Sequence, residues 1–434
     1  MTRRLAIVGG GIAGLAAAWE ASGHDDVEVV VHETTDRLGG KLRTTSFAGR
    51  LVDEGADAFL ARVPWGIDLC RELGVDGALV SPARGNAYIF SDGVLRSIPA
   101  STVLGVPTDL DAAQKSGLVR EPIVVRPGAT PLAPDHDVSV GALIREQLGD
   151  DVLERLVDPL LGGINAGNSD HLSLRAAAPQ IAAAAERDRD LVAALRAAPP
   201  PAPGPVFYSP SDGMGALVDA LVDALAARRV EVRTATTVDT LAGLDADAVV
   251  VAAPAWVAAS LVPEVAAELD SIEHASVALV TLAFDPRAID RPLDASGYLV
   301  PRAEGLLLTA ASWSTAKWAH LAAPDDRVVV RASVGRSDDE RAMALTDDDL
   351  VTRVLADLAT TMALVDEPDD VRISRWSRGF PQYAPGHLAR VDALEAVVAT
   401  ARPTVRLAGA YLRGVGVPAC IRSGREAAAA LLAR

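Results

Sequence analysis

The chain has 434 residues and a formal net charge of −17, half of its residues are apolar, and its two cysteines are Cys70 and Cys420. A chain of this length exceeds one compact core, so we expect two or three lobes. The acidic balance disfavours nucleic acid as a partner, and two cysteines exclude a disulfide framework and suit a reducing cytoplasm.

The N-terminal region predicts a strand, a glycine turn, a helix and a second strand. Residues 5–8 form an apolar run without alternation, residues 12–21 are helical in composition, and residues 27–31 give another strand. This is the order of a Rossmann-like half. A basic pair, Arg3 and Arg4, makes the start resemble a signal peptide, but the glycines of the turn disfavour the apolar helix of such a peptide.

The middle of the chain predicts a helical insertion. A helical block starts at Ser139, an Ala-rich helix follows over residues 176–198, and a proline-rich connector covers residues 199–203. Beyond the connector, strands and helices return, and the stretches 275–284 and 328–334 are rich in β-formers. No internal repeat is present.

These patterns predict an α/β fold with a divided first domain. The expected domains are a Rossmann-like nucleotide-binding domain assembled from residues 1–78, 206–262 and 372–434, a helical insertion over residues 79–205, and a mixed-sheet, β-rich substrate-binding domain over residues 263–371. The longest apolar run, over residues 248–262, is shorter than the roughly 20 residues of a spanning helix. We expect no integral membrane span and a cytoplasmic location, and a peripheral membrane contact stays open.

A glycine-rich turn carries the first functional motif. Gly9-Gly10-Gly11-Ile12-Ala13-Gly14 contains Gly-x-Gly-x-x-Gly between the first strand and the first helix. The glycines let the backbone approach a pyrophosphate, and the helix start supplies N–H donors and a partial positive charge. Glu33 ends the second strand about 20 residues on, where an acid binds ribose hydroxyls. The motif predicts a dinucleotide site and does not separate FAD from NAD.

Three further strings resemble the amine oxidase and porphyrinogen oxidase superfamily of flavoproteins. They are Arg37-Leu38-Gly39-Gly40-Lys41, Gly55-Ala56-Asp57-Ala58, and Gly414-Val415-Gly416-Val417-Pro418 ahead of an Ala-rich helix. The resemblance implies FAD as the cofactor. Ala410 departs from the acid of many superfamily members, at a place where the porphyrinogen oxidase branch is looser. The implied cofactor-binding residues are Gly9, Gly10, Gly11, Ile12, Ala13, Gly14, Glu33, Thr34, Arg37, Gly40, Lys41, Gly55, Ala56, Asp57, Ala58, Val238, Trp376, Val415, Gly416 and Val417.

Longer strings narrow the resemblance to the porphyrinogen oxidase family. They are residues 139–143, 156–167 (Leu-Val-Asp-Pro-Leu-Leu-Gly-Gly-Ile-Asn-Ala-Gly), 172–175, 380–387 (Phe-Pro-Gln-Tyr-Ala-Pro-Gly-His) and 414–421. The resemblance implies FAD-dependent oxidation of coproporphyrinogen III to coproporphyrin III in haem biosynthesis, with oxygen as acceptor and release of hydrogen peroxide. Protoporphyrinogen IX oxidation is the alternative. A flavin amine oxidase, a carotenoid desaturase or a non-catalytic porphyrin carrier is a more distant one.

The resemblance also suggests which residues act on the substrate. Hydride transfer to a flavin needs no strong general base and no metal, so the protein mainly positions the reactants. Lys317 is the candidate for holding a water beside flavin N5, as a lysine does in superfamily relatives. The four propionates of the substrate are expected to meet arginines. The candidates for substrate contact are Arg43, Arg62, Arg84, Arg96, Arg175 and Tyr383. A ferrochelatase-like protein is the candidate partner.

Overall fold

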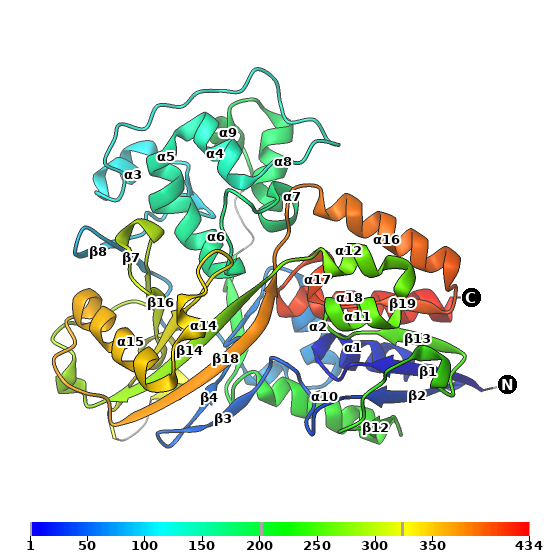
Figure 1. Cartoon of the computed structure of the whole chain (residues 1–434). Coiled ribbons are helices and arrows are strands. Elements are labelled where there is room, and N and C mark those ends of the chain that lie inside the picture. The colour runs from blue at the N-terminus through cyan, green and yellow to red at the C-terminus, as the bar shows by residue number, and fades with distance from the viewer. Residues whose placement is uncertain (1, 200–202, 323–324, 434) are drawn as a thin grey trace.

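Figure 1 shows the chain as three lobes in a computed structural model that describes residues 2–199, 203–322 and 325–433. A helical lobe lies at the top, a lobe built on a large sheet lies at the left, and the lobe at the right carries both termini. The connector expected over residues 199–203 falls mostly outside the described residues. Within those ranges, no helix is long and apolar enough to cross a membrane.

A five-stranded parallel sheet forms the centre of the lobe with the termini. Its order is β12-β2-β1-β13-β19, with the strands β1 (Arg3–Val8), β2 (Val27–His32), β12 (Glu231–Arg233), β13 (Ala248–Val251) and β19 (Val405–Leu407). Three separated stretches of the chain contribute these strands. The apolar runs within β1, β2 and β13 suit a parallel sheet whose two faces are both covered.

Helices cover both faces of this sheet. Leu5 and Ile7 of β1 pack against the α1, α10 and α18 side, and Ala6 and Val8 pack against the α11, α12 and α16 side. The helices are α1 (Ile12–Ala21), α10 (Gly215–Ala227), α11 (Ala255–Leu261), α12 (Ala266–Asp270), α16 (His387–Ala401) and α18 (Val417–Leu432). The parallel order places the starts of α1 and α18 at the carboxyl edge of the sheet.

A seven-stranded mixed sheet forms the second lobe. Its order is β18-β14-β17-β16-β15-β7-β8, with the strands β7 (Tyr88–Ser91), β8 (Val94–Ser97), β14 (His274–Phe284), β15 (Gly297–Leu299), β16 (Leu308–Trp313), β17 (Val328–Val334) and β18 (Asp370–Pro381). Only the β15–β7 pair is parallel among these neighbours. Helix α15 (Asp347–Met362) packs on one face through Leu350, Val354 and Leu358.

The seven-stranded sheet differs in extent from the β-rich domain expected over residues 263–371. It recruits β7 and β8 from the stretch expected to be helical, and β18 runs across the boundary expected at residue 372. Antiparallel pairing joins strands far apart in the sequence, and a local apolar pattern does not reveal the partner of a strand.

The helical lobe has its own apolar core. Its helices are α3 (Leu110–Lys115), α4 (Val140–Leu148), α5 (Asp150–Val152), a π-turn (Leu153–Val157), α6 (Asp158–Asn165), α7 (Leu174–Ala177), α8 (Pro179–Arg187) and α9 (Leu191–Arg196). The single helix expected over residues 176–198 is therefore three helices. Pro179 starts α8 because it lacks an N–H, and the Asp190 side chain caps α9 by accepting the Ala193 N–H.

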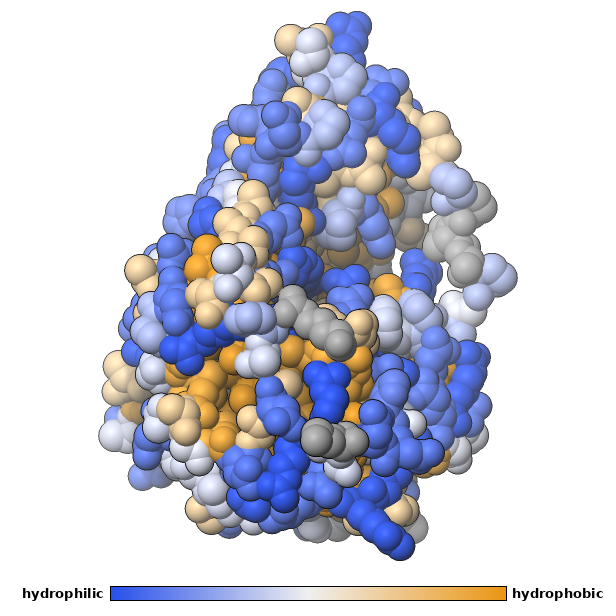
Figure 2. Space-filling model, turned by 90° about the vertical axis from the view of Figure 1, so that its right-hand side faces the viewer, coloured by the Kyte–Doolittle hydropathy of each residue, from blue (hydrophilic) through white to orange (hydrophobic). Residues whose placement is uncertain are grey.

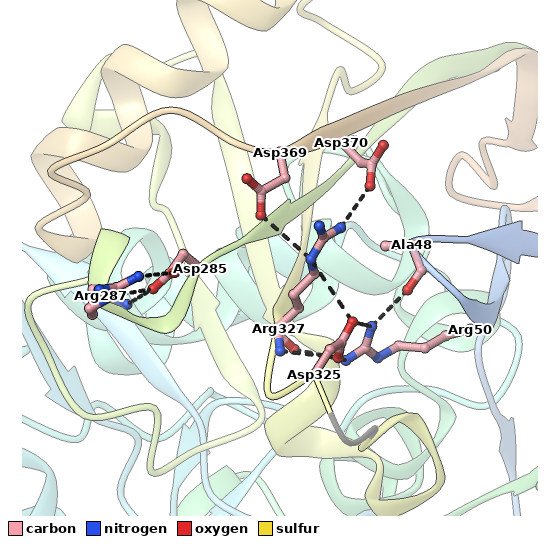
Figure 3. A network of polar contacts seen from close by, with 8 residues as sticks. All are labelled: Ala48, Arg50, Asp285, Arg287, Asp325, Arg327, Asp369 and Asp370. Atoms are coloured by element: carbon pink, nitrogen blue, oxygen red, sulfur yellow. Dashed lines mark hydrogen bonds and ion pairs between the residues drawn. The ribbon is translucent and has the colours of Figure 1, made fainter.

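A short hairpin links the lobe with the termini to the lobe with the seven-stranded sheet. It consists of β3 (Thr44–Phe47) and β4 (Arg50–Asp53), and Figure 3 shows how Arg50 holds it. The Arg50 guanidinium donates to the Ala48 carbonyl at 2.7 Å and pairs with Asp325, which precedes β17. Nearby, Arg327 pairs with Asp370 at the start of β18. These contacts fasten the hairpin to the seven-stranded sheet. The loop that follows β4 begins directly after this fastened hairpin.

Smaller elements complete the fold. They are β5 (Phe59–Leu60), α2 (Pro64–Glu72), β6 (Leu79–Val80), β9 (Thr102–Val103), β10 (Val106–Pro107), β11 (Phe207–Pro210), α13 (Ser314–Lys317), α14 (Arg341–Ala344) and α17 (Ala410–Arg413), with short 3₁₀ turns between them.

Candidate cofactor and substrate site

The glycine turn lies between β1 and α1 at the carboxyl edge of the parallel sheet. Gly9 has a φ of +112°, and a Cβ there would lie 2.6 Å from the Ala252 carbonyl oxygen, so the turn is pressed against the end of β13. A Cβ on Gly11 would meet no described atom within 4 Å, and no described side chain caps α1. The start of α1 therefore faces open space with uncapped N–H groups, as a phosphate site requires.

Glu33 lies beside this turn at the end of β2. Its carboxylate accepts the Gly10 N–H at 2.7 Å and both the backbone N–H and the hydroxyl of Thr35 at 2.8 Å. Thr34 follows it in the chain, and Val238 packs at the rim of the neighbouring core. The hydrogen bonds hold an acid at the edge of the glycine turn, where it can receive ribose hydroxyls.

The loop with Arg37 is laid against the glycine turn. The Arg37 guanidinium donates to the Leu38 carbonyl at 3.1 Å and to the Gly40 carbonyl at 2.5 Å, so it closes its own loop. Gly39 and Gly11 form an isolated parallel bridge. The segment with Gly39 therefore lies directly beside the glycine turn with Gly11.

Lys41 lies where the lobe with the termini meets the lobe with the seven-stranded sheet. Its ammonium donates to the Gly379 carbonyl of β18, and a Cβ on Gly55 would lie 2.3 Å from the Lys41 carbonyl oxygen. The Lys41 side chain is exposed, yet loss of surrounding water lowers its pKa. Lys41 therefore ties the Gly55 loop to the end of β18.

The start of α18 faces the same edge as the start of α1. Val415 and Gly416 precede the first residue of α18, Val417, and no described side chain caps this helix. A Cβ on Gly424 would lie 1.9 Å from the Ala13 carbonyl oxygen, so α18 and α1 are in backbone contact. Two uncapped helix starts therefore lie together at one edge of the sheet, a favourable place for negative charge.

An ion cluster surrounds Asp57 in the loop after β4. The Asp57 carboxylate lies 2.8 Å from the Lys317 ammonium and 3.3 Å from the Arg331 guanidinium, and it accepts the Trp318 indole N–H at 3.2 Å. Burial alone would raise the pKa of Asp57, but Lys317 and Arg331 hold it below its usual range. Lys317, the candidate for a water-binding role, is thus engaged with Asp57 in this structure.

Asp53 is a second buried carboxylate in the same segment. Its Oδ1 accepts the Thr44 hydroxyl and the Met214 N–H, the latter at 2.9 Å. Burial, with a smaller contribution from the nearby Asp57 charge, raises the pKa of Asp53 to about 6. This carboxyl group therefore changes its protonation near neutral pH.

Trp376 stands on β18 opposite the Gly55 loop. Its indole N–H donates to the Glu54 carbonyl at 2.7 Å, and its ring lies 3.7 Å from the position of a Cβ on Gly55. The pairing of β14 and β18 shifts between Ala275 and Val277, and Arg378 has a φ of +51° in this bulged region. Trp376 is paired with Val277 just before this bulge, and the bulge redirects the following residues, among them Gly379, whose carbonyl accepts the Lys41 ammonium.

The end of α6 forms a second wall of the region where the lobes meet, in addition to the end of β18. Ile164 is 49% exposed, and Gly163 is also exposed, with the position of its absent Cβ lying 3.3 Å from the Leu299 side chain. Gln382, just after β18, donates to the Asn165 carbonyl at 3.0 Å. Figure 2 shows the surface hollowed between the helical lobe and the lobe with the termini. The end of α6 therefore presents an exposed apolar side chain next to a glycine, which has no side chain.

The substrate candidates from the sequence differ in their contacts and exposure. Arg43 pairs with Glu54 at 3.2 Å, Arg62 and Arg84 are exposed, and Arg96 is half-buried with an Nε that lacks a described partner. Two candidates are taken up by internal contacts. Arg175 pairs with Glu186, and Tyr383 is 2% exposed, stacks on His387 and donates its hydroxyl to Ala410. Both side chains are held by the protein itself.

Sequence reasoning missed Arg331, Trp318 and Asp53. Val330 and Ala332, on either side of Arg331 in β17, face the α15 core. Because successive side chains of a strand point to opposite faces, Arg331 points to the other face of the sheet. That alternation could have marked Arg331 as a cation on the inner face. Its meeting with Asp57 depends on how β17 packs against the loop after β4, and the sequence holds no local signal for that contact.

The described residues fit FAD. Gly11 leaves room before the start of α1, Glu33 is fixed beside it, and the start of α18 and Lys41 lie at the same edge. Uncapped helix starts favour phosphate and a negatively polarised ring edge, and the acid suits a ribose. FAD would therefore lie along the carboxyl edge of the parallel sheet, between the glycine turn and the Gly55 loop.

Comparison with known proteins agrees with this site. The family described as "Flavin containing amine oxidoreductase" matches residues 12–432. The chain is 37% identical to the coproporphyrinogen III oxidase of Mycobacterium leprae (strain TN), over 100% of this chain and 99% of that protein. It is 32% identical to the coproporphyrinogen III oxidase of Bacillus subtilis (strain 168), over 98% and 97%. A crystal structure of a candidate protoporphyrinogen oxidase from Exiguobacterium sp. 255-15 has a TM-score of 0.90 at 32% identity and covers 100% of both chains. The chain therefore belongs to the flavin-containing amine oxidoreductase family and, within it, to the group of the bacterial coproporphyrinogen III oxidases.

Proposed function

We propose that this protein oxidises coproporphyrinogen III to coproporphyrin III with FAD as its cofactor. The supporting observation is that β18 joins the cofactor edge to the α6 wall. Lys41 donates to Gly379 on this strand, and Gln382, three residues further on, donates to Asn165 at the end of α6. A flat substrate resting on α6 would therefore lie beside the flavin.

The residues of the chain position the reactants and exclude water. FAD supplies the hydride acceptor for the bridging carbons of the macrocycle. We assign the glycine turn and Glu33 to the dinucleotide part of FAD, and the start of α18 with Lys41 to the edge of the flavin ring. Negative charge that develops on the ring during reduction would be stabilised by this helix start and this ammonium. Trp376 and Ile164 form apolar walls on the two sides of the junction.

The wider setting of the reaction belongs to the same proposal. Oxygen accepts the electrons and hydrogen peroxide leaves, and a ferrochelatase-like protein receives the product. We assign FAD binding to the lobe with the parallel sheet and substrate binding to the face where the seven-stranded sheet meets the helical lobe. The two-cysteine composition favours a cytoplasmic location.

Anaerobic mixing tests the proposed function. Purified yellow protein is mixed with coproporphyrinogen III or with protoporphyrinogen IX, and bleaching of the flavin absorbance is followed in a stopped-flow instrument. We expect fast bleaching with coproporphyrinogen III and slow bleaching with protoporphyrinogen IX. The reverse order would reassign the substrate to protoporphyrinogen IX, as the name of the structural relative suggests. No bleaching with either would refute a porphyrinogen oxidase.

A further inference from the structure

Arg336 follows β17 where the seven-stranded sheet meets the helical lobe. Gly335 has a φ of +91°, and a Cβ there would lie 2.6 Å from the Ser276 carbonyl oxygen, so the chain passes close to the residue of β14 that faces the β18 bulge. On its other side, the Ser337 N–H donates to the Ala166 carbonyl at 2.8 Å. Arg336 is therefore fixed between Ser276 of β14 and the end of α6.

The nearest acids are in direct contact with a different arginine. The Arg302 Nε lies 3.0 Å from the Asp158 carboxylate, and the same guanidinium pairs with Asp338. Asp338 also accepts the Asn168 side-chain amide at 2.8 Å. Arg302 therefore makes the direct contacts to both carboxylates, and its one positive charge is shared between the two acids.

The remaining acid near Arg336 is also taken. Asp339 lies 2.6 Å from the Arg341 guanidinium, two residues along the chain. Across residues 2–199, 203–322 and 325–433, the Arg336 guanidinium has no hydrogen bond and no ion pair. Arg336 is thus a guanidinium without a direct partner, beside acids whose direct contacts are made by Arg302 and Arg341.

The position of Arg336 removes water from its charge. Burial, together with repulsion from Arg302, lowers the pKa of the Arg336 guanidinium, although Asp158 and Asp338 oppose this. An arginine stays charged at neutral pH after such a change. A half-buried cation without a partner has lost solvation without gaining an ion pair, so an anion that reaches it would bind favourably.

The surroundings favour an anion attached to an apolar body. Ala166, whose carbonyl holds the Arg336 turn, packs in one cluster with Trp376 and Phe380. Ile164, two residues before it on α6, is 49% exposed. A ligand that covers this apolar surface could extend a carboxylate to the guanidinium, which can bind it through two parallel N–H bonds.

We propose that Arg336 binds one propionate carboxylate of the tetrapyrrole substrate. This inference rests on the proposed function. The other reading is a guanidinium that stays solvated and contacts no substrate. Arg336 carries out no chemical step, so its contribution belongs to substrate affinity and leaves the hydride transfer itself unaffected.

Steady-state kinetics of variants test the proposal. Arg336→Gln and Arg336→Lys are compared with Arg353→Gln, which removes an equal charge from the exposed face of α15. We expect Arg336→Gln to raise KM for coproporphyrinogen III by roughly tenfold to a hundredfold with kcat within about twofold, since one charge-assisted pair is lost. Arg336→Lys is expected to recover part of the affinity, and Arg353→Gln to behave as the wild type.

A binding measurement separates affinity from folding. Fluorescence titration with coproporphyrin III reports binding without turnover, and FAD content with the melting temperature reports the fold. An unchanged KM and an unchanged titration in folded Arg336→Gln would overturn the role of Arg336 and leave the proposed function standing. A wild-type protein that oxidises neither porphyrinogen would overturn the proposed function, and the inference with it.

Discussion

The Lys317 ammonium lies 2.8 Å from the Asp57 carboxylate, and this pair joins α13 of the sheet lobe to the loop after β4. Arg331 of β17 reinforces the contact from 3.3 Å and also donates to the Gly55 carbonyl at 3.0 Å. The side chains of Lys317 and Asp57 are 18% and 17% exposed, so water screens the pair only in part. The cluster therefore sets the position of the loop that is assigned to the flavin.

Replacing Lys317 with Met is expected to loosen this loop. Asp57 would keep Arg331 as its partner, so we expect a loss of about 1–3 kcal/mol in the free energy of unfolding, less than for a fully orphaned buried charge. FAD dissociation is expected to become faster. Urea unfolding and the release of FAD fluorescence measure the two effects. Lys317→Arg is the charge-preserving control. Unchanged stability and FAD retention in Lys317→Met would contradict a positioning role.

The same cluster predicts a direction for acid sensitivity. The pKa of Asp57 is held below its usual range, so its stabilising contribution is present at neutral pH and is lost as pH falls through the lowered folded-state value. In Lys317→Met the pKa of Asp57 is expected to move upward toward its ordinary value, so the stability lost on acidification is expected to be smaller than in the wild type. Unfolding free energies measured from pH 7 down to pH 3 test this shift.

Asp53 predicts the opposite dependence on pH. Its folded-state pKa of about 6 lies above the ordinary value of 3.8, so the protonated form is favoured by folding. This contribution is present below pH 3.8 and is lost as pH rises through about 6. Asp53→Asn keeps a carbonyl oxygen as acceptor for Thr44 and Met214 and removes the titration. We expect the variant to be more stable than the wild type at pH 8 by up to about 3 kcal/mol.

The Asp53 prediction has a clear comparison. Urea unfolding at pH 5 and pH 8 gives the difference between variant and wild type, which cancels the titration of all other groups. Asp219→Asn, on an exposed position of α10, is the matched control and is expected to show no such difference. A variant whose stability relative to the wild type is the same at both pH values would contradict the buried, protonated carboxyl group.

The sequence predicted the parts of the site that depend on local backbone. The turn from Gly9 to Gly14 joins β1 to α1, Glu33 directly follows β2, and Gly416 directly precedes α18, so spacing along the chain determines their positions. Strands β1, β2 and β13 were also predictable because each contains a short apolar run. These elements require no knowledge of distant contacts.

The parts that depended on tertiary contacts were not predictable. Arg331 and Trp318 meet Asp57 only because β17 and α13 pack on the loop after β4. The aromatic character of Tyr383 suggested a ligand wall, but its ring stacks on His387 and is buried. The Ala-rich composition also suggested one continuous helix where the chain forms three. A run of helix-forming residues does not compensate for the missing N–H of Pro179, which starts α8, or prevent Asp190 from capping a new helix.

Arg50 predicts how firmly the β3–β4 hairpin is held. Its guanidinium is almost fully buried, with a 4% exposed side chain. It donates to the Ala48 carbonyl and pairs with Asp325, as Figure 3 shows, and it also donates to the Leu321 carbonyl. Arg50→Met would leave these acceptors without a donor, so we expect the melting temperature to fall by a few degrees and FAD to be held less tightly.

Arg287 provides the matched control in the same region. It pairs with Asp285 (Figure 3), but its side chain is 91% exposed, so Arg287→Met is expected to leave the melting temperature unchanged. Differential scanning fluorimetry of both variants makes the comparison. Equal melting temperatures for Arg50→Met and the wild type would show that the hairpin does not depend on this guanidinium.

Two glycines beside α1 predict opposite effects of one added methyl group. On Gly11 the new carbon would meet no described atom, so Gly11→Ala is expected to change the unfolding free energy of the FAD-free protein by no more than about 1 kcal/mol. The methyl would occupy the space before the helix start, and FAD affinity is expected to fall sharply. On Gly424 the new carbon would lie 1.9 Å from the Ala13 carbonyl oxygen, so α1 and α18 must separate, at a cost of about 3 kcal/mol or more. Urea unfolding of FAD-free protein and FAD titration by fluorescence quenching distinguish the two variants. If Gly11→Ala bound FAD as tightly as the wild type, the space before α1 would not be the phosphate site.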